Sequence, residues 1–195
     1  MRIVSMLGAV AVTFAGGVAS ASTWELDASH SQVGFGVKHL MVSTTKGNFK
    51  KFSGTLTLDD KDVTKSNVVV DIDTASVDTD EPKRDEHLRS PDFFQSDKFP
   101  KMSFKSTKVE KQGEALLVTG DLTIRGVTKP VVLKVEGFGP EVKDPWGNTR
   151  RGAVATTQIK RSDFGLTWNK SLETGGVVVG DEVAINIECE LIKKK

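Results

Sequence analysis

Three histidines, His30, His39 and His87, are the side chains of this sequence best suited to zinc binding or acid–base chemistry. Zinc motifs place their histidines on one face at short, fixed spacings. His30 and His39 have opposite parity in an alternating strand pattern, and His87 falls in a segment with helical signals. Ser31 follows His30, but a nucleophile and its base pair in space rather than by adjacency, and the chain has no G-x-S-x-G elbow. We therefore expect structural or surface roles for the histidines, and no catalytic residue.

Charged side chains are concentrated in residues 83–89, with the sequence KRDEHLR. Pairs spaced four apart would support a helix there, and the same segment could present arginines at the mouth of a cavity. Simple solvation of an exposed helix face is the alternative interpretation. The single cysteine, Cys189, is in phase with the apolar residues of the last predicted strand, which predicts a buried and unreactive thiol.

The amino-terminal segment has the three regions of a secretory signal. Arg2 is followed by an uncharged, apolar run over residues 3–18, which ends at Ala19-Ser20-Ala21. This order matches a positive region, a hydrophobic region and an A-x-A cleavage site, and the run is short for a membrane span. We predict that residues 1–21 are removed, and that residues 22–195 form one exported, periplasmic domain.

The charge balance argues against a polyanion partner. The 195 residues carry 27 basic and 26 acidic side chains, and loss of Arg2 with the signal leaves the two kinds in equal number. We therefore expect no nucleic-acid partner. The lysines at 193–195 could touch an anionic surface, although a solvated tail is the simpler interpretation.

Strand periodicity is the strongest pattern in the sequence. Apolar and polar residues alternate over several short runs that are separated by turn-forming residues such as Gly, Asp, Asn and Pro. Without long helices between them, the strands should form a mainly antiparallel sheet, and about eight such strands can close into a barrel. The predicted fold class is an all-β, closed antiparallel barrel with one short helix. The predicted strands are 32–38, 52–59, 68–73, 101–105, 116–125, 131–137, 152–160 and 183–191.

Residues 80–100 break the strand pattern. Asp80 is predicted as the N-cap of a short helix over 81–88, with Pro82 in the first turn and a stop near Ser90 and Pro91. A dense aromatic group follows, made of Phe93, Phe94 and Phe99. These rings could plug one end of the barrel, or they could form a mobile lid over an apolar cavity.

Six stretches, taken in order, resemble one known family. They are DASHSQVGF at 27–35, GNFKKFSG at 47–54, RDEHLRSPDFF at 84–94, FPKMSFKS at 99–106, GDLTIRGVTKP at 120–130 and RSDFGL at 161–166. Together they resemble the YceI-like family of polyisoprenoid-binding, lipocalin-like proteins over nearly the whole exported chain. The 84–94 and 120–130 stretches are the most specific.

The resemblance implies an extended antiparallel barrel with a long apolar tunnel. It implies a periplasmic protein that binds a long-chain polyisoprenoid, quinone-like or fatty-acyl lipid for transport, storage or sequestration, with no cofactor besides that lipid. A homodimer and a transient membrane contact are two further hypotheses about its partners. The family supplies no catalytic residue to carry over, which again predicts a protein that is not an enzyme.

The parity of the strands nominates the residues that face the lipid. The wall candidates are the apolar series Phe35, Val37, Phe52, Met102, Phe104, Leu122 and Ile124. The mouth candidates are Arg84, Phe93, Phe94 and Trp168, and Leu88 is a further candidate for lipid binding. Core packing is the competing role for each apolar residue, because a core and a ligand wall both need buried apolar side chains.

Two alternative functions share this strand pattern. A small outer-membrane barrel would have the same alternation with the two faces exchanged, and it predicts aromatic girdles. The chain has no Tyr and only three Trp, which disfavours that reading. A haem- or metal-binding enzyme of lipocalin-like fold would have to use His30, His39 or His87.

Overall fold

The computed structural model describes residues 21–173 and 175–195. Most of the predicted signal lies outside the described residues, and its last residue, Ala21, begins the first strand. No helix in the described part of the chain is long and apolar enough to cross a membrane. Residues 21–173 and 175–195 contain a single α-helix, α1 (Pro82–Arg89), among the strands and three short 3-10 turns.

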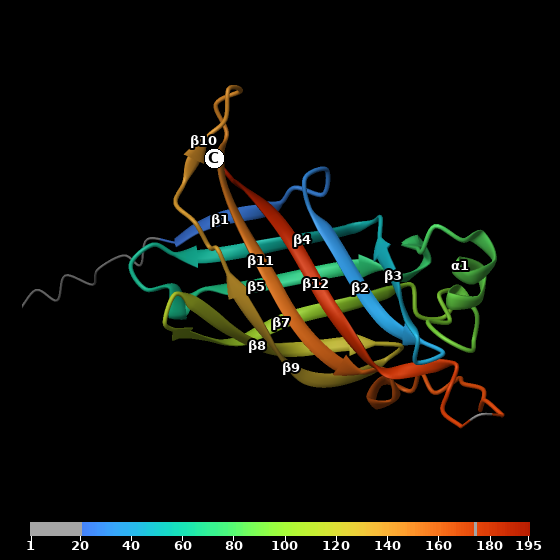
Figure 1. Cartoon of the computed structure of the whole chain (residues 1–195). Helices are drawn as coiled ribbons and strands as arrows, with labels where there is room; N and C mark the ends of the chain where they lie inside the picture. Colours follow the sequence, from blue (N-terminus) through green and yellow to red (C-terminus); the bar gives the residue numbers. More distant parts are fainter. Residues whose placement is uncertain (1–20, 174) are drawn as a thin grey trace, which may run out of the picture.

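The strands form one continuous antiparallel sheet that closes on itself (Figure 1). They are β1 (Ala21–Leu26), β2 (Gln32–His39), β3 (Ser43–Phe49), β4 (Phe52–Asp59), β5 (Asn67–Asp73), β6 (Val77–Asp78), β7 (Lys101–Gln112), β8 (Ala115–Ile124), β9 (Val127–Glu136), β10 (Val142–Lys143), β11 (Thr149–Lys160) and β12 (Val179–Lys193). The 3-10 turns are η1 (Val63–Lys65), η2 (Thr74–Ser76) and η3 (Arg161–Phe164). Closure comes from β12, which pairs with β11 on one side and with β1 and β2 on the other.

Interrupted strands account for most of the difference between twelve labelled strands and an eight-stranded barrel. β1 and β2 lie end to end along β12, where Leu26 pairs with Leu191 and Val33 with Ile187. β3 and β4 continue each other in the same way, as do β5 and β6. β10 extends β9 along β11. Each of the eight predicted strands falls on one of these continuous strands, so the prediction of a closed antiparallel barrel is confirmed.

The segments that the sequence pattern missed are polar or short. β3 contains Ser43, Thr44, Thr45, Lys46 and Asn48, and in the structure it presents only Phe49 as a fully buried apolar residue. Its strand conformation follows from its ladder with β2 rather than from local alternation. Tertiary pairing therefore outweighs local pattern in this part of the barrel.

Helix α1 forms where the charged cluster predicted it, but its N-cap differs from the prediction. Glu81 is the cap, because its Oε2 accepts a hydrogen bond of 2.6 Å from the amide of Arg84. Asp80 has a positive φ of 59° and lies outside the helix, so the expectation that it caps the helix is wrong. The helix ends at Ser90, immediately before Pro91, as expected.

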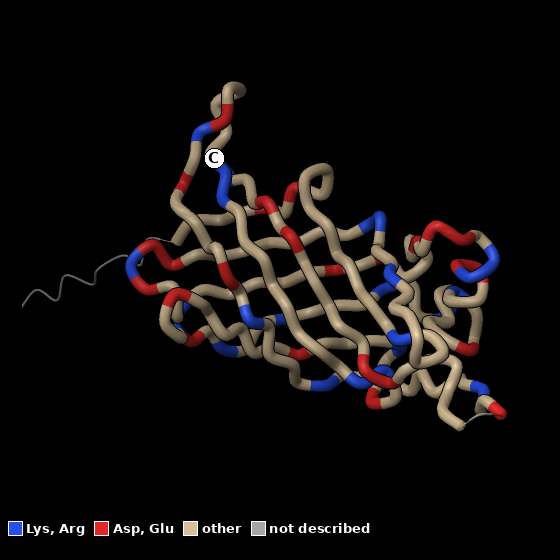
Figure 2. Tube along the Cα trace, in the orientation of Figure 1, with Lys and Arg blue, Asp and Glu red and all other residues tan. Residues whose placement is uncertain are grey.

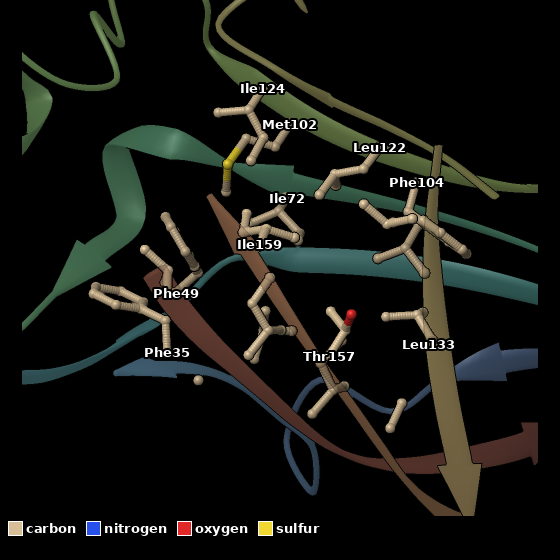
Figure 3. Close-up of a pocket in the computed structure, with 18 of the residues that line it drawn as sticks. Phe35, Phe49, Ile72, Met102, Phe104, Leu122, Ile124, Leu133, Thr157 and Ile159 are labelled. Carbon is tan, nitrogen blue, oxygen red and sulfur yellow. The ribbon is translucent and has the colours of Figure 1, made fainter. Parts of the chain in front are cut away.

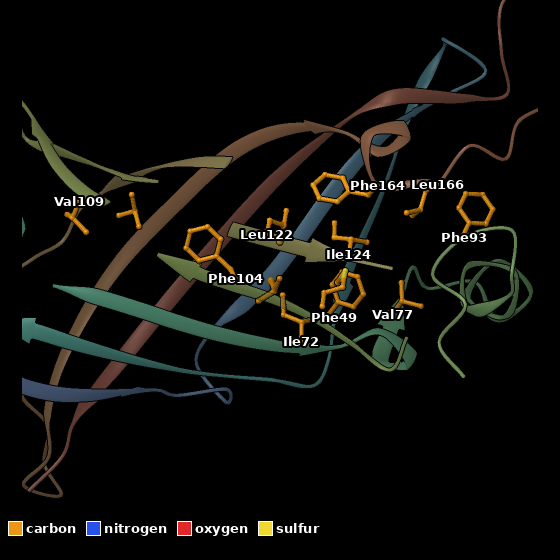
Figure 4. Close-up of a cluster of buried hydrophobic side chains, with 13 residues drawn as sticks. Phe49, Ile72, Val77, Phe93, Phe104, Val109, Leu122, Ile124, Phe164 and Leu166 are labelled. Carbon is orange, nitrogen blue, oxygen red and sulfur yellow. The ribbon is translucent and has the colours of Figure 1, made fainter. Parts of the chain in front are cut away.

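The main core lies inside the barrel toward its α1 end (Figure 4). Its members come from nearly every strand and from the segments that cover this end. The fully buried residues are Val33, Phe49, Ile72, Val77, Phe93, Met102, Phe104, Val109, Val118, Leu122, Ile124, Phe164 and Leu166. A smaller cluster, with Trp24, Leu58 and Leu191, lies near the other end, where the guanidinium of Arg151 stacks over the Trp24 ring at 5.4 Å.

Gly120 in β8 shows how tightly the wall is packed. A β-carbon at this position would lie 2.4 Å from Cζ of the buried Phe104 and 2.6 Å from the carbonyl oxygen of Lys105. The ring of Phe104 occupies the space that any other residue at position 120 would need.

We predict that Gly120→Ala lowers the free energy of unfolding by about 1–3 kcal/mol, because the ring and a backbone carbonyl would both have to shift. Urea denaturation followed by Trp fluorescence measures this change. Gly152→Ala in β11 is the matched control, since its nearest contact would be 3.7 Å away, and it should change stability by less than about 0.5 kcal/mol. Equal effects of the two substitutions would contradict this account of the packing.

Candidate functional site

A cavity of about 470 Å³ lies inside the barrel. Apolar side chains from opposite walls point into it, among them Phe35, Met102, Leu133 and Ile159 (Figure 3). The volume is within the range of small-molecule sites, which run from about 300 to 1,000 Å³. The cavity and the main core share many residues, so the same strand faces serve both.

Eleven of the twelve residues predicted to face a lipid line this cavity. They are Phe35, Val37, Arg84, Leu88, Phe93, Phe94, Met102, Phe104, Leu122, Ile124 and Trp168. Several are also fully buried core residues, as the competing interpretation expected. Their position follows from the structure, and their contact with a lipid stays a prediction.

Phe52 is the candidate that the structure leaves outside the lining. It has the parity of Gly54 and Leu56, which do line the cavity, and it packs against the main core. Phe52 is the first residue of β4, directly after the break between β3 and β4 at Lys50 and Lys51. Parity identified the correct face, but it could not show that this ring packs against the core without lining the cavity.

Sequence reasoning missed the contribution of the last three long strands. β9, β11 and β12 supply many lining residues, for example Leu133, Thr157 and Ile185. Their alternation was visible, but polar residues such as Thr157 obscured which face was dry. Charged residues also escaped notice, since Lys38 and Arg161 line the cavity as well.

One end of the barrel is covered by α1 and the aromatic segment that follows it (Figure 1). His87 meets Phe93 and Trp168 edge to face, with ring centroids 5.0 and 4.8 Å apart. Phe94 packs against Phe49 at 5.6 Å. Phe93 is 7% exposed and belongs to the main core, so the structure shows this end in a closed arrangement. Opening of the segment as a lid stays a prediction.

Arg84 is held at this end by Thr79. Its Nε donates to Thr79 Oγ1 at 2.8 Å, and its Nη2 donates to the Thr79 carbonyl at 2.7 Å. The buried carboxylate of Asp85 accepts hydrogen bonds from the amide and the hydroxyl of Thr79 at 2.9 and 2.5 Å. Arg84 and Asp85 are thus coupled through one threonine, which orients the arginine side chain at the cavity rim.

Arg161 is a buried cation in the cavity lining, with 7% of its surface exposed. Its Nε donates to the carbonyl of Gly180 at 2.9 Å, and its Nη1 donates to that of Leu166 at 2.5 Å. Burial lowers the pKa of Arg161, and the charge of Asp181 opposes that shift. Backbone carbonyls therefore hold this guanidinium, with no ion pair to it among the described residues.

Asp27, His30 and Glu190 bring three possible metal ligands within 4.8 Å of one another. The guanidinium of Arg150 already occupies this cluster, since its Nη1 donates to Asp27 at 2.7 Å and to Glu190 at 2.5 Å. A cation is thus supplied by the chain, and the donor set does not suit a metal ion. Nδ1 of His30 donates to Oδ2 of Asp27 at 2.8 Å, which places His30 in the same polar network.

Cys189 also lines the cavity, on the apolar face of β12 as its parity predicted. Its Sγ donates to the carbonyl of Ala153 at 3.3 Å. Burial raises the pKa of the Cys189 thiol. The thiol therefore stays protonated near neutral pH, which disfavours reactivity.

Comparison with known proteins gives one consistent result. Residues 24–191 match the family model described as the YceI-like domain. The UPF0312 protein plu2095 of Photorhabdus laumondii is 43% identical over 157 residues, which are 80% of this chain and 81% of that protein. Protein YceI of Shigella flexneri is 43% identical over 166 residues, which are 83% and 86% of the two chains.

Solved structures share the fold. BcnA of Burkholderia cenocepacia superimposes with a TM-score of 0.72 at 26% identity, over 85% of this chain and 98% of that one. The YceI protein of Campylobacter jejuni has a TM-score of 0.68 at 39% identity, over 81% and 90% of the chains. A domain from Saccharophagus degradans, described as polyisoprenoid binding, matches in fold with a TM-score of 0.63 at 17% identity, over 88% and 98%.

The Arg150 network generates a prediction about acid stability. Arg150 joins Asp27 before β2, Asp144 before β11 and Glu190 in β12. The hydroxyl of Ser29 and then Arg150 hold the pKa of Asp27 well below its usual range, and Arg150 does the same for Asp144. A depressed carboxylate pKa stabilises the fold above the unfolded-state value of about 3.9, and this stabilisation is lost as pH falls below it.

We therefore expect Arg150→Gln to have a lower free energy of unfolding than the parent chain at pH 7. This difference, the stability gap, should be smaller at pH 3. Urea denaturation at the two pH values measures the gap. Lys143→Gln, an exposed change on the neighbouring strand β10, is the control and should match the parent at both values. A gap that stays constant between pH 7 and pH 3 would show that the network does not act through these carboxylates.

Proposed function

Because this chain belongs to the YceI-like domain family, we propose that it is a binding protein that holds one long apolar lipid inside its barrel. The observation that carries the proposal is the 470 Å³ cavity, whose lining is built almost wholly from apolar strand faces. The ligand classes proposed are polyisoprenoid, quinone-like and fatty-acyl chains, held for transport, storage or sequestration. A related fold described as polyisoprenoid binding supports the first class.

The energetics of burial favour a chain-like ligand. Each buried CH₂ contributes about 0.8 kcal/mol, so one five-carbon isoprene unit offers roughly 4 kcal/mol before the cost of ordering the chain. A few units would reach the highest affinities that noncovalent binding attains. The tail would thus set the strength of binding, while polar groups at an end of the cavity would select the head group.

The direction of the strand faces supports a ligand inside the barrel rather than lipid around it. The outward positions of β7 include the exposed, charged residues Lys101, Lys105 and Lys108. Lys, Arg, Asp and Glu residues also occur along other strands of the barrel (Figure 2). An outer-membrane barrel would instead present an apolar band on this surface.

The proposed site of action is the periplasm, with export directed by residues 1–21. A carrier in that compartment would exchange its lipid with a membrane, and the turn between β2 and β3 offers a contact for this step. Met41 and Val42 are 61% and 82% exposed there, and Leu40 and Met41 both have positive φ. Residues 28–58 contain four lysines and no acidic residue, which suits an anionic membrane surface.

A homodimer is the second partner proposal. Analytical ultracentrifugation of the purified protein tests it, since a monomer across the micromolar range would exclude it.

The experiment that tests the proposed function uses protein purified from periplasm without detergent. Organic extraction followed by mass spectrometry should recover a polyprenyl, quinone-like or fatty-acyl species in near-stoichiometric amount. Protein that is empty after purification, and that takes up none of these lipids on incubation, would refute the proposal. An absorbance scan of the same sample tests the haem alternative, because a stoichiometric Soret band would support that reading instead.

A cavity-filling substitution gives a sharper prediction. Thr157 lines the cavity, whereas its neighbour Thr156 in β11 does not. We expect Thr157→Trp to weaken retention of the extracted lipid by at least about tenfold, because the indole takes space that the chain needs. Thr156→Trp should bind as the parent does. The melting temperatures of both variants show whether weaker binding comes from a filled cavity or from a destabilised fold. Equal lipid binding by the two variants would contradict the assignment of the cavity as the binding site.

The membrane contact is tested at Met41. Met41→Asp should weaken binding to vesicles of phosphatidylcholine and phosphatidylglycerol about tenfold, because an apolar side chain is lost and a negative charge is added. Trp146→Asp is the control. Trp146 is 81% exposed, but it lies in the turn before β11 beside the acidic residue Asp144. Cosedimentation that is unchanged in Met41→Asp, or equally reduced in both variants, would overturn this contact.

A further inference from the structure

The cavity has a strong asymmetry of charge. Among the described residues no Asp or Glu lines it, whereas five basic residues do. These are Lys38, His39, Arg84, His87 and Arg161. Hydrogen bonds, strand pairing and ring contacts link all of them to the elements that cover the α1 end.

The first link runs between β2 and β12. Val179 of β12 pairs with His39 of β2. The guanidinium of Arg161 donates to the carbonyls of Val179 and Gly180, at 3.4 and 2.9 Å. A β-carbon on Gly180 would lie 3.2 Å from Cβ of Lys38. Lys38, His39 and Arg161 therefore surround one short stretch of β12.

The second link joins this stretch to the helix. Asn169 donates from Nδ2 to the Val179 carbonyl at 2.7 Å, and its neighbour Trp168 meets the ring of His87 at 4.8 Å. His87 lies on α1, the helix that also carries Arg84. The segment with Trp168 and Asn169 thus connects the two groups of basic residues.

The opposite end of the cavity is of different character. It is lined by apolar residues such as Leu58, Val63, Val109 and Leu191, next to the cluster around Trp24. Ser66 and Asn67 are the polar side chains there, and the Ser66 hydroxyl already accepts a hydrogen bond of 3.0 Å from the amide of Asp59. No charged side chain of the described chain lines that end.

Four acidic groups near the basic end have other partners. Glu81 caps the backbone of α1, and Asp85 is bound by Thr79. Asp181 accepts hydrogen bonds from the amide and hydroxyl of Ser162, at 3.0 and 2.7 Å. Asp92 pairs with His87 at 2.9 Å, so this histidine alone has an acidic partner.

Arg84, Lys38 and Arg161 have no carboxylate within ion-pair distance among the described residues. Of these three, only Arg161 is buried, whereas Arg84 and Lys38 are exposed at the rim. Burying a cation without an ion-pair partner is costly, and an anion placed beside Arg161 recovers part of that cost. Guanidinium groups also bind carboxylate and phosphate oxygens with two parallel hydrogen bonds. An anionic group at the α1 end would thus meet one buried guanidinium and two exposed cations.

Building on the proposed lipid-binding function, we propose that the ligand is an amphiphile with an anionic head, a phosphate or a carboxylate. The head lies at the α1 end beside Arg84, Lys38 and Arg161, and the tail runs toward the cluster around Trp24. The chain thereby selects its lipid by the charge of the head as well as by the length of the tail.

Three probes with the same sixteen-carbon tail test this proposal: hexadecyl phosphate, hexadecanoate and 1-hexadecanol. Each displaces the neutral dye N-phenyl-1-naphthylamine from delipidated protein, at probe concentrations below micelle formation. We expect at least one anionic probe to bind about tenfold or more tightly than the alcohol, since a charge-assisted hydrogen bond has about that effect. Preference for the phosphate or for the carboxylate distinguishes the two head chemistries.

The double variant Arg84→Gln with Lys38→Gln should bring the ratio of anionic-probe affinity to 1-hexadecanol affinity close to one. Lys83→Gln is the matched control, because Lys83 is exposed on the same helix and does not line the cavity. Melting temperatures verify that each variant folds. Arg161 is left intact in this series, because its hydrogen bonds also join η3 to β12.

The outcomes separate this inference from the proposed function. Equal affinity of the parent protein for all three probes would overturn the anionic head and leave lipid binding standing. Displacement by none of the probes, together with an empty purified protein, would overturn both. If the double variant loses affinity for the alcohol and for the anionic probes to the same extent, the inference is also overturned. The two residues would then affect the shape of the cavity rather than recognise charge. A loss confined to the anionic probes supports it.

Discussion

Closure of the sheet by β12 is the constraint on which the rest of this structure depends. β12 pairs with β11 along one edge and with β1 and β2 along the other, so no long strand is left with an open edge in the ring. Because side chains alternate across a strand, closure divides every strand into one face toward the interior and one toward water. The apolar core, the cavity and the charged outer surface are three consequences of that single division.

Because several strands are interrupted, the two ends of the barrel are built from different strands and different side chains. Where β1 and β4 form the wall, Trp24, Leu58 and Leu191 pack together beneath Arg151. Where β2 and β3 form it, the wall meets α1 and the aromatic residues that follow the helix. The interior is thus apolar at one end and carries basic groups at the other. A long lipid with one polar end would match this arrangement better than a symmetrical hydrocarbon.

Charged residues in this protein act through position more than through number. Arg150 is surrounded by three carboxylates and pins three distant segments together, which explains why the potential metal ligands around it serve the fold. Arg161 has the same side chain but meets only backbone carbonyls beside the cavity. The chemical meaning of each arginine comes from what the fold places beside it.

The sequence alone determined the features that depend on local pattern. Alternation in residues such as Met102, Phe104 and Leu122 identified the strands and their dry face, because period-two spacing is a property of the backbone itself. Motifs along the chain identified the family. Local pattern could not show that Phe52 falls outside the cavity, or that Glu81 rather than Asp80 caps α1.

Only the tertiary structure placed Lys38, Arg84 and Arg161 at the same end of one cavity, since these residues lie on three elements far apart in the chain. Their convergence depends on strand register and on how the barrel closes. Both are set by long-range pairing and packing, which no short stretch of sequence contains.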